Sequence, residues 1–279
     1  MGLGGLGLRK TGLACNRSRL ASSTAIAGKP ALLADRSTVN LLAAMSKRFG
    51  CVAAVDYRDP VGSANKCPID RVRITPLHHA HAPHLNIVGL DVAAYGGRQK
   101  DPLRALPIHA DDYKLGTTWA YLIDLLDEQG KVVFRIHYTD AAATPPHGLA
   151  SASVIAERDV DVAIACVPGF EQSDDYPVGL IENQRVRYVF AAHWEDFFQP
   201  RQEILSPLRQ VLDAPAIERF IDVVDAQLPR SRGVVPLNKG AACSRAKPCG
   251  PHGQAWALPV PGETFHFQTS KGVERVSTR

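Results

Sequence analysis

The fold of this chain is constrained most by a series of short, strongly apolar segments between residues 118 and 192. Residues 118–124 and 132–138 are rich in β-branched and aromatic side chains, and the acidic turn 127–130 between them ends in a glycine. This pattern predicts a β-hairpin. Residues 160–167 and 186–192 are apolar runs separated by an amphipathic stretch to about residue 184, which predicts strand, helix and strand of a buried sheet. The central part of the chain therefore predicts an α/β fold.

The flanking segments add further elements. Residues 37–49 begin with a hydroxyl cap candidate, Ser37, carry apolar side chains at helical spacing and end at Gly50, which predicts a helix. Residues 72–74 and 85–92 predict strands, with a histidine-rich loop between them, and residues 216–228 predict a second helix. The many prolines after residue 235 argue against a long regular element there.

The domain organisation follows from length and from the absence of a pattern at the start of the chain. A chain of 279 residues with 45% hydrophobic side chains is long enough for one sizeable core. Residues 1–28 show neither a helical nor an alternating apolar period, so we expect them to be disordered. We therefore expect one domain over residues 29–279 and no assigned structure before it.

Charge and cysteine content exclude several classes of protein. The formal net charge of +4 comes from 32 basic and 28 acidic residues, a mixed surface that does not favour nucleic-acid binding. No apolar run is long enough to predict a membrane span. The six scattered cysteines are unlike a disulfide scaffold, which favours a cytoplasmic location. The basic, acid-poor residues 1–34 leave an organellar transit peptide as an alternative.

Several side chains that can bind metal ions follow predicted strands. Four histidines lie within seven residues after the strand at residue 74, an aspartate follows the strand 132–138, and a histidine ends the strand 186–192; these are His78, His79, His81, His84, Asp140 and His193. Imidazole and carboxylate groups are common ligands of Zn²⁺ and related ions, and strand ends hold ligands rigidly. The alternative is structural: solvated loop histidines, a turn-forming aspartate and a histidine at the core edge.

The order of these motifs resembles the metallo-β-lactamase superfamily. The resemblance rests on five segments over roughly residues 30 to 235, namely PLHHAHAPH at 76–84, YLID at 121–124, RIHYTD at 135–140, VDVAI at 160–164 and HWEDFF at 193–198. By position it implies that His81, Asp140 and His193 are metal ligands, with Asp140 bridging two ions. His79 or His84 can take the place of His81, because no alignment fixes the register of the loop.

The resemblance also implies a four-layer αββα sandwich of two sheets with helices outside. The first metal motif of that superfamily, His-x-His-x-Asp-His, does not occur in the chain, and no histidine precedes His78. We therefore expect a sandwich that is incomplete at its N-terminus and an incomplete metal site. A truncated or frame-shifted start and a divergent N-terminus both remain open.

The function implied by the resemblance is hydrolysis of a small-molecule substrate. A bound Zn²⁺, Mn²⁺ or Fe²⁺ ion lowers the pKa of a water molecule and supplies hydroxide for attack on an ester, amide or phosphoester. The alternative is a truncated chain or pseudoenzyme that binds at most one metal ion weakly and catalyses nothing. A third reading, a structural or interaction module, leaves the residues at the strand ends unexplained. The Cys243, Cys249 and His252 cluster fits no common zinc spacing.

Overall fold

The structure of the chain is a computed structural model. It describes residues 29–55, 67, 69–82, 85–87, 90–92, 96–109, 112–196, 214–228, 255–259, 264–269 and 272–277. These residues form a mixed α/β fold with one six-stranded sheet, three two-stranded sheets and short helices. The α/β class expected from the sequence is confirmed at this level. The second large sheet of a four-layer sandwich stays a prediction, and so does the expected single domain over residues 29–279.

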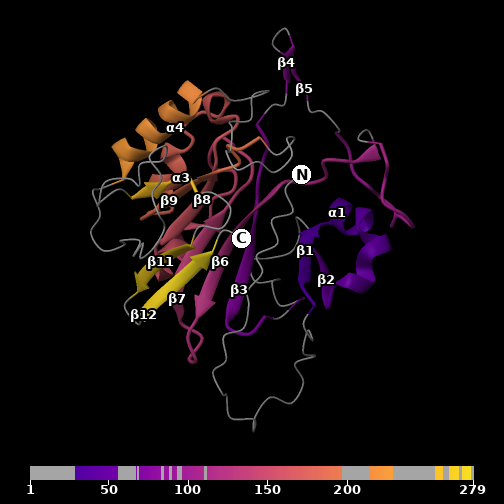
Figure 1. Cartoon of the computed structure of the whole chain (residues 1–279), viewed down its shortest axis with the longest axis horizontal. Coiled ribbons are helices and arrows are strands. Elements are labelled where there is room, and N and C mark those ends of the chain that lie inside the picture. Colours follow the sequence, from indigo (N-terminus) through magenta and orange to yellow (C-terminus); the bar gives the residue numbers. More distant parts are fainter. Residues whose placement is uncertain are drawn as a thin grey trace.

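The six-stranded sheet is the centre of the fold (Figure 1). Its order is β10-β9-β8-β7-β6-β3, and the strands are Trp256–Ala257 (β10), Val189–Ala192 (β9), Val162–Cys166 (β8), Val132–Tyr138 (β7), Trp119–Leu126 (β6) and Val72–His78 (β3). Strand β6 is antiparallel to both β3 and β7, whereas β7, β8, β9 and β10 are parallel to one another. Five strands therefore run in one direction, and β6 alone among these six runs in the other.

The other elements surround this sheet. Helices α4 (Ala214–Gln227) and α3 (Val178–Asn183) lie near its β9 end, and β1 (Ala31–Asp35), α1 (Arg36–Leu41) and β2 (Cys51–Val55) lie beyond β3 (Figure 1). The remaining elements are the 3₁₀ helices η1 (Ala43–Arg48) and η4 (Phe170–Gln172), helix α2 (Ala152–Glu157), and two hairpins, β4 (Leu85–Ile87) with β5 (Leu90–Val92) and β11 (Thr264–Thr269) with β12 (Gly272–Ser277). None of the described helices is long and apolar enough to cross a membrane.

Several element boundaries differ from those expected. The predicted helix 37–49 is a short α-helix followed by a 3₁₀ helix, and its cap is Asp35, whose carboxylate accepts from the backbone N–H groups of Ser37 and Thr38. The strand expected over 85–92 is two strands paired as a hairpin. Strand β3 continues through Pro76 to His78, so the histidine cluster begins within a strand. A proline is tolerated there because β3 is an edge strand among the described residues.

Aromatic side chains fill the core around the sheet. Phe267 of β11 packs on Phe134 of β7 and on Tyr188, with ring centroids 5.7 and 5.4 Å apart. Phe220 of α4 packs edge-on against Phe170, at 5.3 Å. Strand β11, which the sequence did not predict, therefore contributes to the main core.

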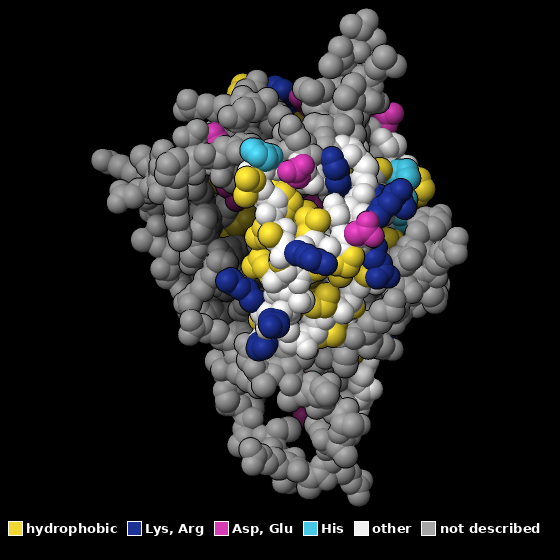
Figure 2. Space-filling view, turned by 90° about the vertical axis from the view of Figure 1, so that its right-hand side faces the viewer, with side chains coloured by type: hydrophobic (Ala, Val, Ile, Leu, Met, Phe, Trp, Pro, Cys, Tyr) yellow, Lys and Arg dark blue, Asp and Glu magenta, His cyan; other side chains and the backbone are white. Residues whose placement is uncertain are grey.

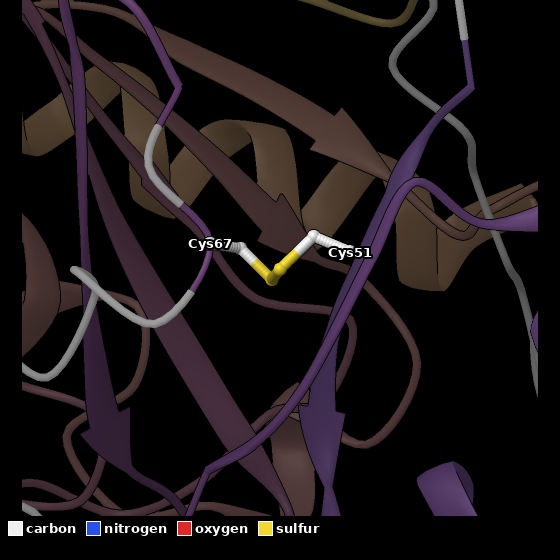
Figure 3. The surroundings of a disulfide bond; sticks show 2 residues. All are labelled: Cys51 and Cys67. Atoms are coloured by element: carbon white, nitrogen blue, oxygen red, sulfur yellow. A yellow bond between two sulfur atoms is a disulfide. The ribbon is translucent and has the colours of Figure 1, made fainter. Parts of the chain in front are cut away.

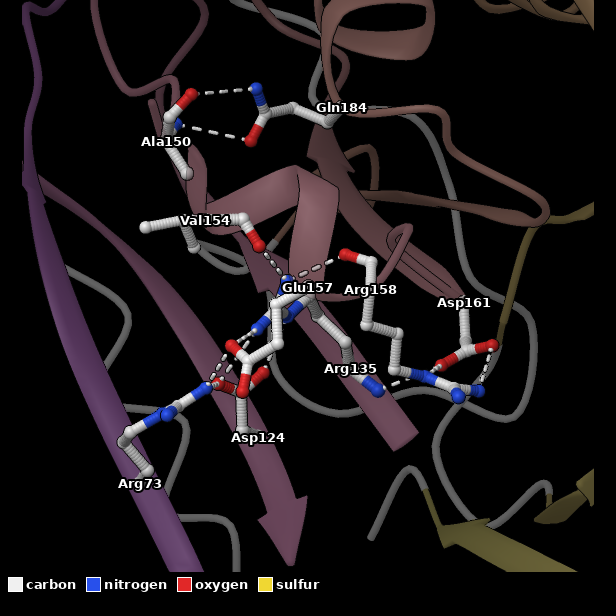
Figure 4. A network of polar contacts seen from close by, with 9 residues as sticks. All are labelled: Arg73, Asp124, Arg135, Ala150, Val154, Glu157, Arg158, Asp161 and Gln184. Atoms are coloured by element: carbon white, nitrogen blue, oxygen red, sulfur yellow. Dashed lines mark hydrogen bonds and ion pairs between the residues drawn. The ribbon is translucent and has the colours of Figure 1, made fainter. Parts of the chain in front are cut away.

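A fully buried arginine anchors strands β6 and β7 to helix α2 (Figure 4). Arg135 donates to both carboxylate oxygens of Asp124, at 2.6 and 3.1 Å, and to Glu157 at 3.0 Å. Its remaining guanidinium nitrogen donates to the backbone oxygens of Val154 and Arg158. Arg73 of β3 also donates to Asp124, at 2.6 Å. Because the five N–H groups of Arg135 all have acceptors, burial of its charge is fully compensated.

Strands β1 and β2 are parallel and joined through α1, so they form a small βαβ unit. This unit and Pro102 line a partly open, mainly apolar pocket of about 140 Å³, formed by Leu32, Val39, Asn40, Leu42, Ala43, Ser46, Phe49, Val52 and Pro102. On the face turned to the viewer in Figure 2, hydrophobic side chains gather near the centre, with Lys and Arg side chains around them.

A disulfide bond joins Cys51, the first residue of β2, to Cys67, which lies just before β3 (Figure 3). This pair could not be predicted from the sequence, because spacing alone does not show which cysteines meet. The bond closes a loop with a sequence separation of 16 residues, and it ties the β1-α1-β2 unit to the main sheet.

We expect the double substitution Cys51→Ser, Cys67→Ser to lower the free energy of unfolding by about 2 to 3 kcal/mol, because it releases a loop of this length in the unfolded chain. Urea unfolding of the variant and the parent chain measures the difference. The control is a reductant, which should bring the parent chain to the stability of the variant and leave the variant unchanged. A parent chain that is insensitive to reductant and no more stable than the variant would show that the bond does not form.

Candidate functional site

The candidate site lies at one edge of the main sheet. Strands β3, β7, β8 and β9 run in the same direction, so their carboxyl ends meet at this edge together with the start of β6. The side chains at or just after these ends are His78, His79, His81, Tyr138, Asp140, Cys166 and His193. Ligands of open α/β sheets bind outside the carboxyl ends of strands, which makes this edge the place to look for a site.

Asp140 is the electrostatic centre of this edge. Its side chain is exposed, two residues beyond the end of β7. Burial raises the pKa of Tyr121, Tyr138 and Cys166, and in each case the negative charge of Asp140 raises it further. A carboxylate at the carboxyl ends of parallel strands, near the half-buried Tyr121 and Tyr138 and the buried Cys166, attracts a cation to this edge.

His193 shares this environment and has an unusual backbone. Its φ angle is 62°, in the left-handed region that a non-glycine residue adopts at a cost of about 1 kcal/mol or more. Burial lowers the pKa of its imidazole, whereas the negative charges of Asp140 and Glu195 raise it. The charge of His81 also lowers the pKa of His193. The three residues predicted as ligands thus lie at one edge of the sheet.

The histidines after β3 differ in their surroundings. His79 is buried, and its Nε2 lies 2.8 Å from both the Ala141 carbonyl oxygen and the Thr139 hydroxyl. His81 is exposed, and its Nδ1 lies 2.7 Å from the carbonyl oxygen of Ala82. In metal-binding histidines, one ring nitrogen usually donates to a carbonyl oxygen or carboxylate while the other binds the ion. His84, the remaining alternative for this position, lies outside the described residues.

The loop that carries Asp140 is fastened to β3 and β7 at Gly148. The backbone N–H of Gly148 donates to the carbonyl of His78 at 2.8 Å, and its own carbonyl accepts from Nε2 of His137 at 2.7 Å. Gly148 has a φ of 73°, and a Cβ atom there would collide with the ring of His79. Only glycine fits this close approach, so loop 139–150 has a fixed path beside the strand ends.

The donor types at this edge fit a divalent metal ion, since two imidazoles and a carboxylate are a common set for Zn²⁺, Mn²⁺ or Fe²⁺. Their arrangement does not complete a metal site: in the part of the chain that the structure describes, no group of three or more His, Cys, Asp or Glu side chains is placed to hold an ion. We therefore assign no catalytic step to a metal ion.

Some residues at this edge were not singled out from the sequence. Cys166 ends β8 and is buried, and Tyr121 is paired with Tyr138 across β6 and β7. Strand order and register bring these residues beside Asp140, and neither is visible in a single sequence. The one available signal for Cys166 was its position as the last residue but one of a predicted buried strand.

Comparison with known proteins assigns neither a family nor a function to the chain. No protein-family model matches the chain, and neither a curated protein nor a solved structure is similar to it.

Proposed function

We propose that the chain is a metal-dependent hydrolase of the metallo-β-lactamase type, with a four-layer sandwich fold and a small-molecule substrate. In this proposal Asp140 and His193 hold the ion, and His81 completes the ligand set. The observation that carries the proposal is the common placement of these residues at the carboxyl ends of β7, β9 and β3.

A second candidate is a non-catalytic metal-binding protein with an incomplete site. It is favoured by the absence of any complete ligand group among the described residues. Affinity depends on ligand number, so this candidate implies weak binding of less than two ions per chain. Both candidate functions predict the same metal ligands. Only the hydrolase predicts turnover of a substrate.

The test is a panel of ester, lactam and phosphodiester substrates with added Zn²⁺ or Mn²⁺. For a hydrolase we expect turnover that depends on the metal ion and that falls by about a hundredfold or more in Asp140→Ala, because a ligand is lost. Asp101→Ala is the matched control, since Asp101 is exposed on a loop that carries none of the proposed ligands. Metal binding without turnover supports the second candidate. Turnover that survives Asp140→Ala unchanged contradicts the assignment of the site.

A further inference from the structure

A second pair of imidazoles lies close together at the sheet edge. The rings of His78 and His147 have centroids 6.1 Å apart and planes inclined by 58°. His78 is the last residue of β3, and His147 belongs to the loop after β7, 69 positions later in the chain. Neither residue is among the ligands of the proposed hydrolytic site.

The geometry of the pair suits shared coordination of one ion. With metal–nitrogen bonds of about 2.1 Å and an open angle at the metal, two imidazoles place their ring centroids roughly 5 to 6 Å apart. Side chains at the observed separation reach this range with small rotations. Both histidines are exposed, so an ion reaches them directly from solvent.

The backbone holds the two histidines in place before any ligand binds. Gly148, the neighbour of His147, donates its N–H to the carbonyl of His78 at 2.8 Å. Trp119 meets the His78 ring edge-on at 5.7 Å, and the indole is buried. A fixed backbone and a rigid aromatic wall reduce the ordering cost of binding.

We propose that His78 and His147 form a second metal site, a two-imidazole site for Cu²⁺ and related late first-row ions. Imidazole suits Cu²⁺, Ni²⁺ and Zn²⁺, and Cu²⁺ binds most tightly in this series. Two protein ligands leave the other coordination positions to water. The site therefore takes up an ion reversibly and is distinct from the centre around Asp140.

The experiment is a Cu²⁺ titration of the full chain, followed by calorimetry and by tryptophan fluorescence, which a bound Cu²⁺ ion beside Trp119 quenches. We expect His78→Ala and His147→Ala each to weaken binding by about tenfold or more, since each removes one of two ligands. His109→Ala is the matched control, because His109 is exposed on a different loop. Trp119→Phe should remove most of the quenching while calorimetry still detects the ion.

The Asp140→Ala variant separates this site from the proposed hydrolytic centre. It should retain Cu²⁺ binding and weaken it far less than His78→Ala or His147→Ala does, because it removes a neighbouring negative charge and no ligand of this site. Loss of binding in Asp140→Ala would overturn the proposal, because the ion would then belong to the other centre. Equal affinities of His147→Ala and His109→Ala would overturn it as well. Circular dichroism of each variant verifies that the substitutions, including the one at the buried Trp119, leave the fold intact.

Discussion

Asp124→Ala is expected to lower the free energy of unfolding by about 3 to 5 kcal/mol, as measured by urea unfolding of the full chain. The substitution removes the carboxylate that two arginines share. Arg135 has no exposed side-chain surface, so its charge remains in the core, and Glu157 is the one acidic side chain among the described residues that still pairs with its guanidinium. A buried charge that loses its principal partner is strongly destabilising.

Two further variants show whether the expected loss of stability comes from the uncompensated buried charge of Arg135 or would follow the removal of any ion pair. Asp159→Ala removes a carboxylate that pairs with the half-exposed Arg187 at 3.0 Å, and it should cost about 1 kcal/mol or less. Adding Arg135→Met to Asp124→Ala should restore part of the stability, because the uncompensated charge is then gone. If Asp124→Ala and Asp159→Ala cost the same, the buried network does not stabilise the sheet as described.

Acidification from pH 6.5 to pH 4 is expected to cost the fold about 3 kcal/mol through His137 alone. Burial lowers the pKa of this imidazole to about 4, although its hydrogen bond to Gly148 raises it and the proximity of His79 lowers it further. Because the pKa in the folded chain is below the unfolded value, the folded state favours the neutral ring. The stabilisation is complete above the unfolded pKa and is lost as the pH falls towards the folded pKa.

The measurement is urea unfolding at several pH values in this range. His137→Gln keeps a donor for the Gly148 carbonyl and has no titratable group, so its stability should depend less steeply on pH than that of the parent chain. His109→Ala, at an exposed position, should leave the slope unchanged. Parallel pH profiles for His137→Gln and the parent chain would mean that His137 does not titrate in this way.

The sequence predicted the central strands well because their residues are apolar at short, regular intervals. The hairpin 118–138 and the strand at 160–167 correspond to β6, β7 and β8, with boundaries within two residues. Each of these strands buries either both of its faces or every second side chain. The apolar pattern that this burial requires is therefore visible in the strand's own sequence, whatever elements lie next to it. Helix 216–228 is found at 214–227 for the same reason.

Elements that depend on distant contacts were not predicted. Strands β10 and β11 lie in a proline-rich region, and they form because they meet β9 and the aromatic core, which no local pattern indicates. The capping role of Asp35 was missed because Ser37 is an equally good candidate from composition. The expectation that residues 1–28 are disordered concerns residues outside the described part of the chain.

The sequence predicted the strand ends at which the candidate residues lie, and the metal site itself stays a prediction. The strand ends next to Asp140 and His193 can be predicted from the sequence, because a polar residue after an apolar run indicates where a buried strand ends. The buried position of His79 and the pairing of His78 with His147 depend on the path of loop 139–150, which Gly148 fixes through contacts across the fold. Loop paths of this kind cannot be deduced from one sequence.

The central claim is that Asp140 and His193 bind one divalent metal ion at the carboxyl ends of β7 and β9. Crystals of the full chain soaked with Zn²⁺ and measured at the zinc absorption edge test it directly. The account predicts an anomalous peak within about 2.2 Å of the Asp140 carboxylate and the His193 imidazole, absent from crystals of Asp140→Ala. Zinc bound only elsewhere on the chain, or a peak at this edge that persists in Asp140→Ala, would contradict it.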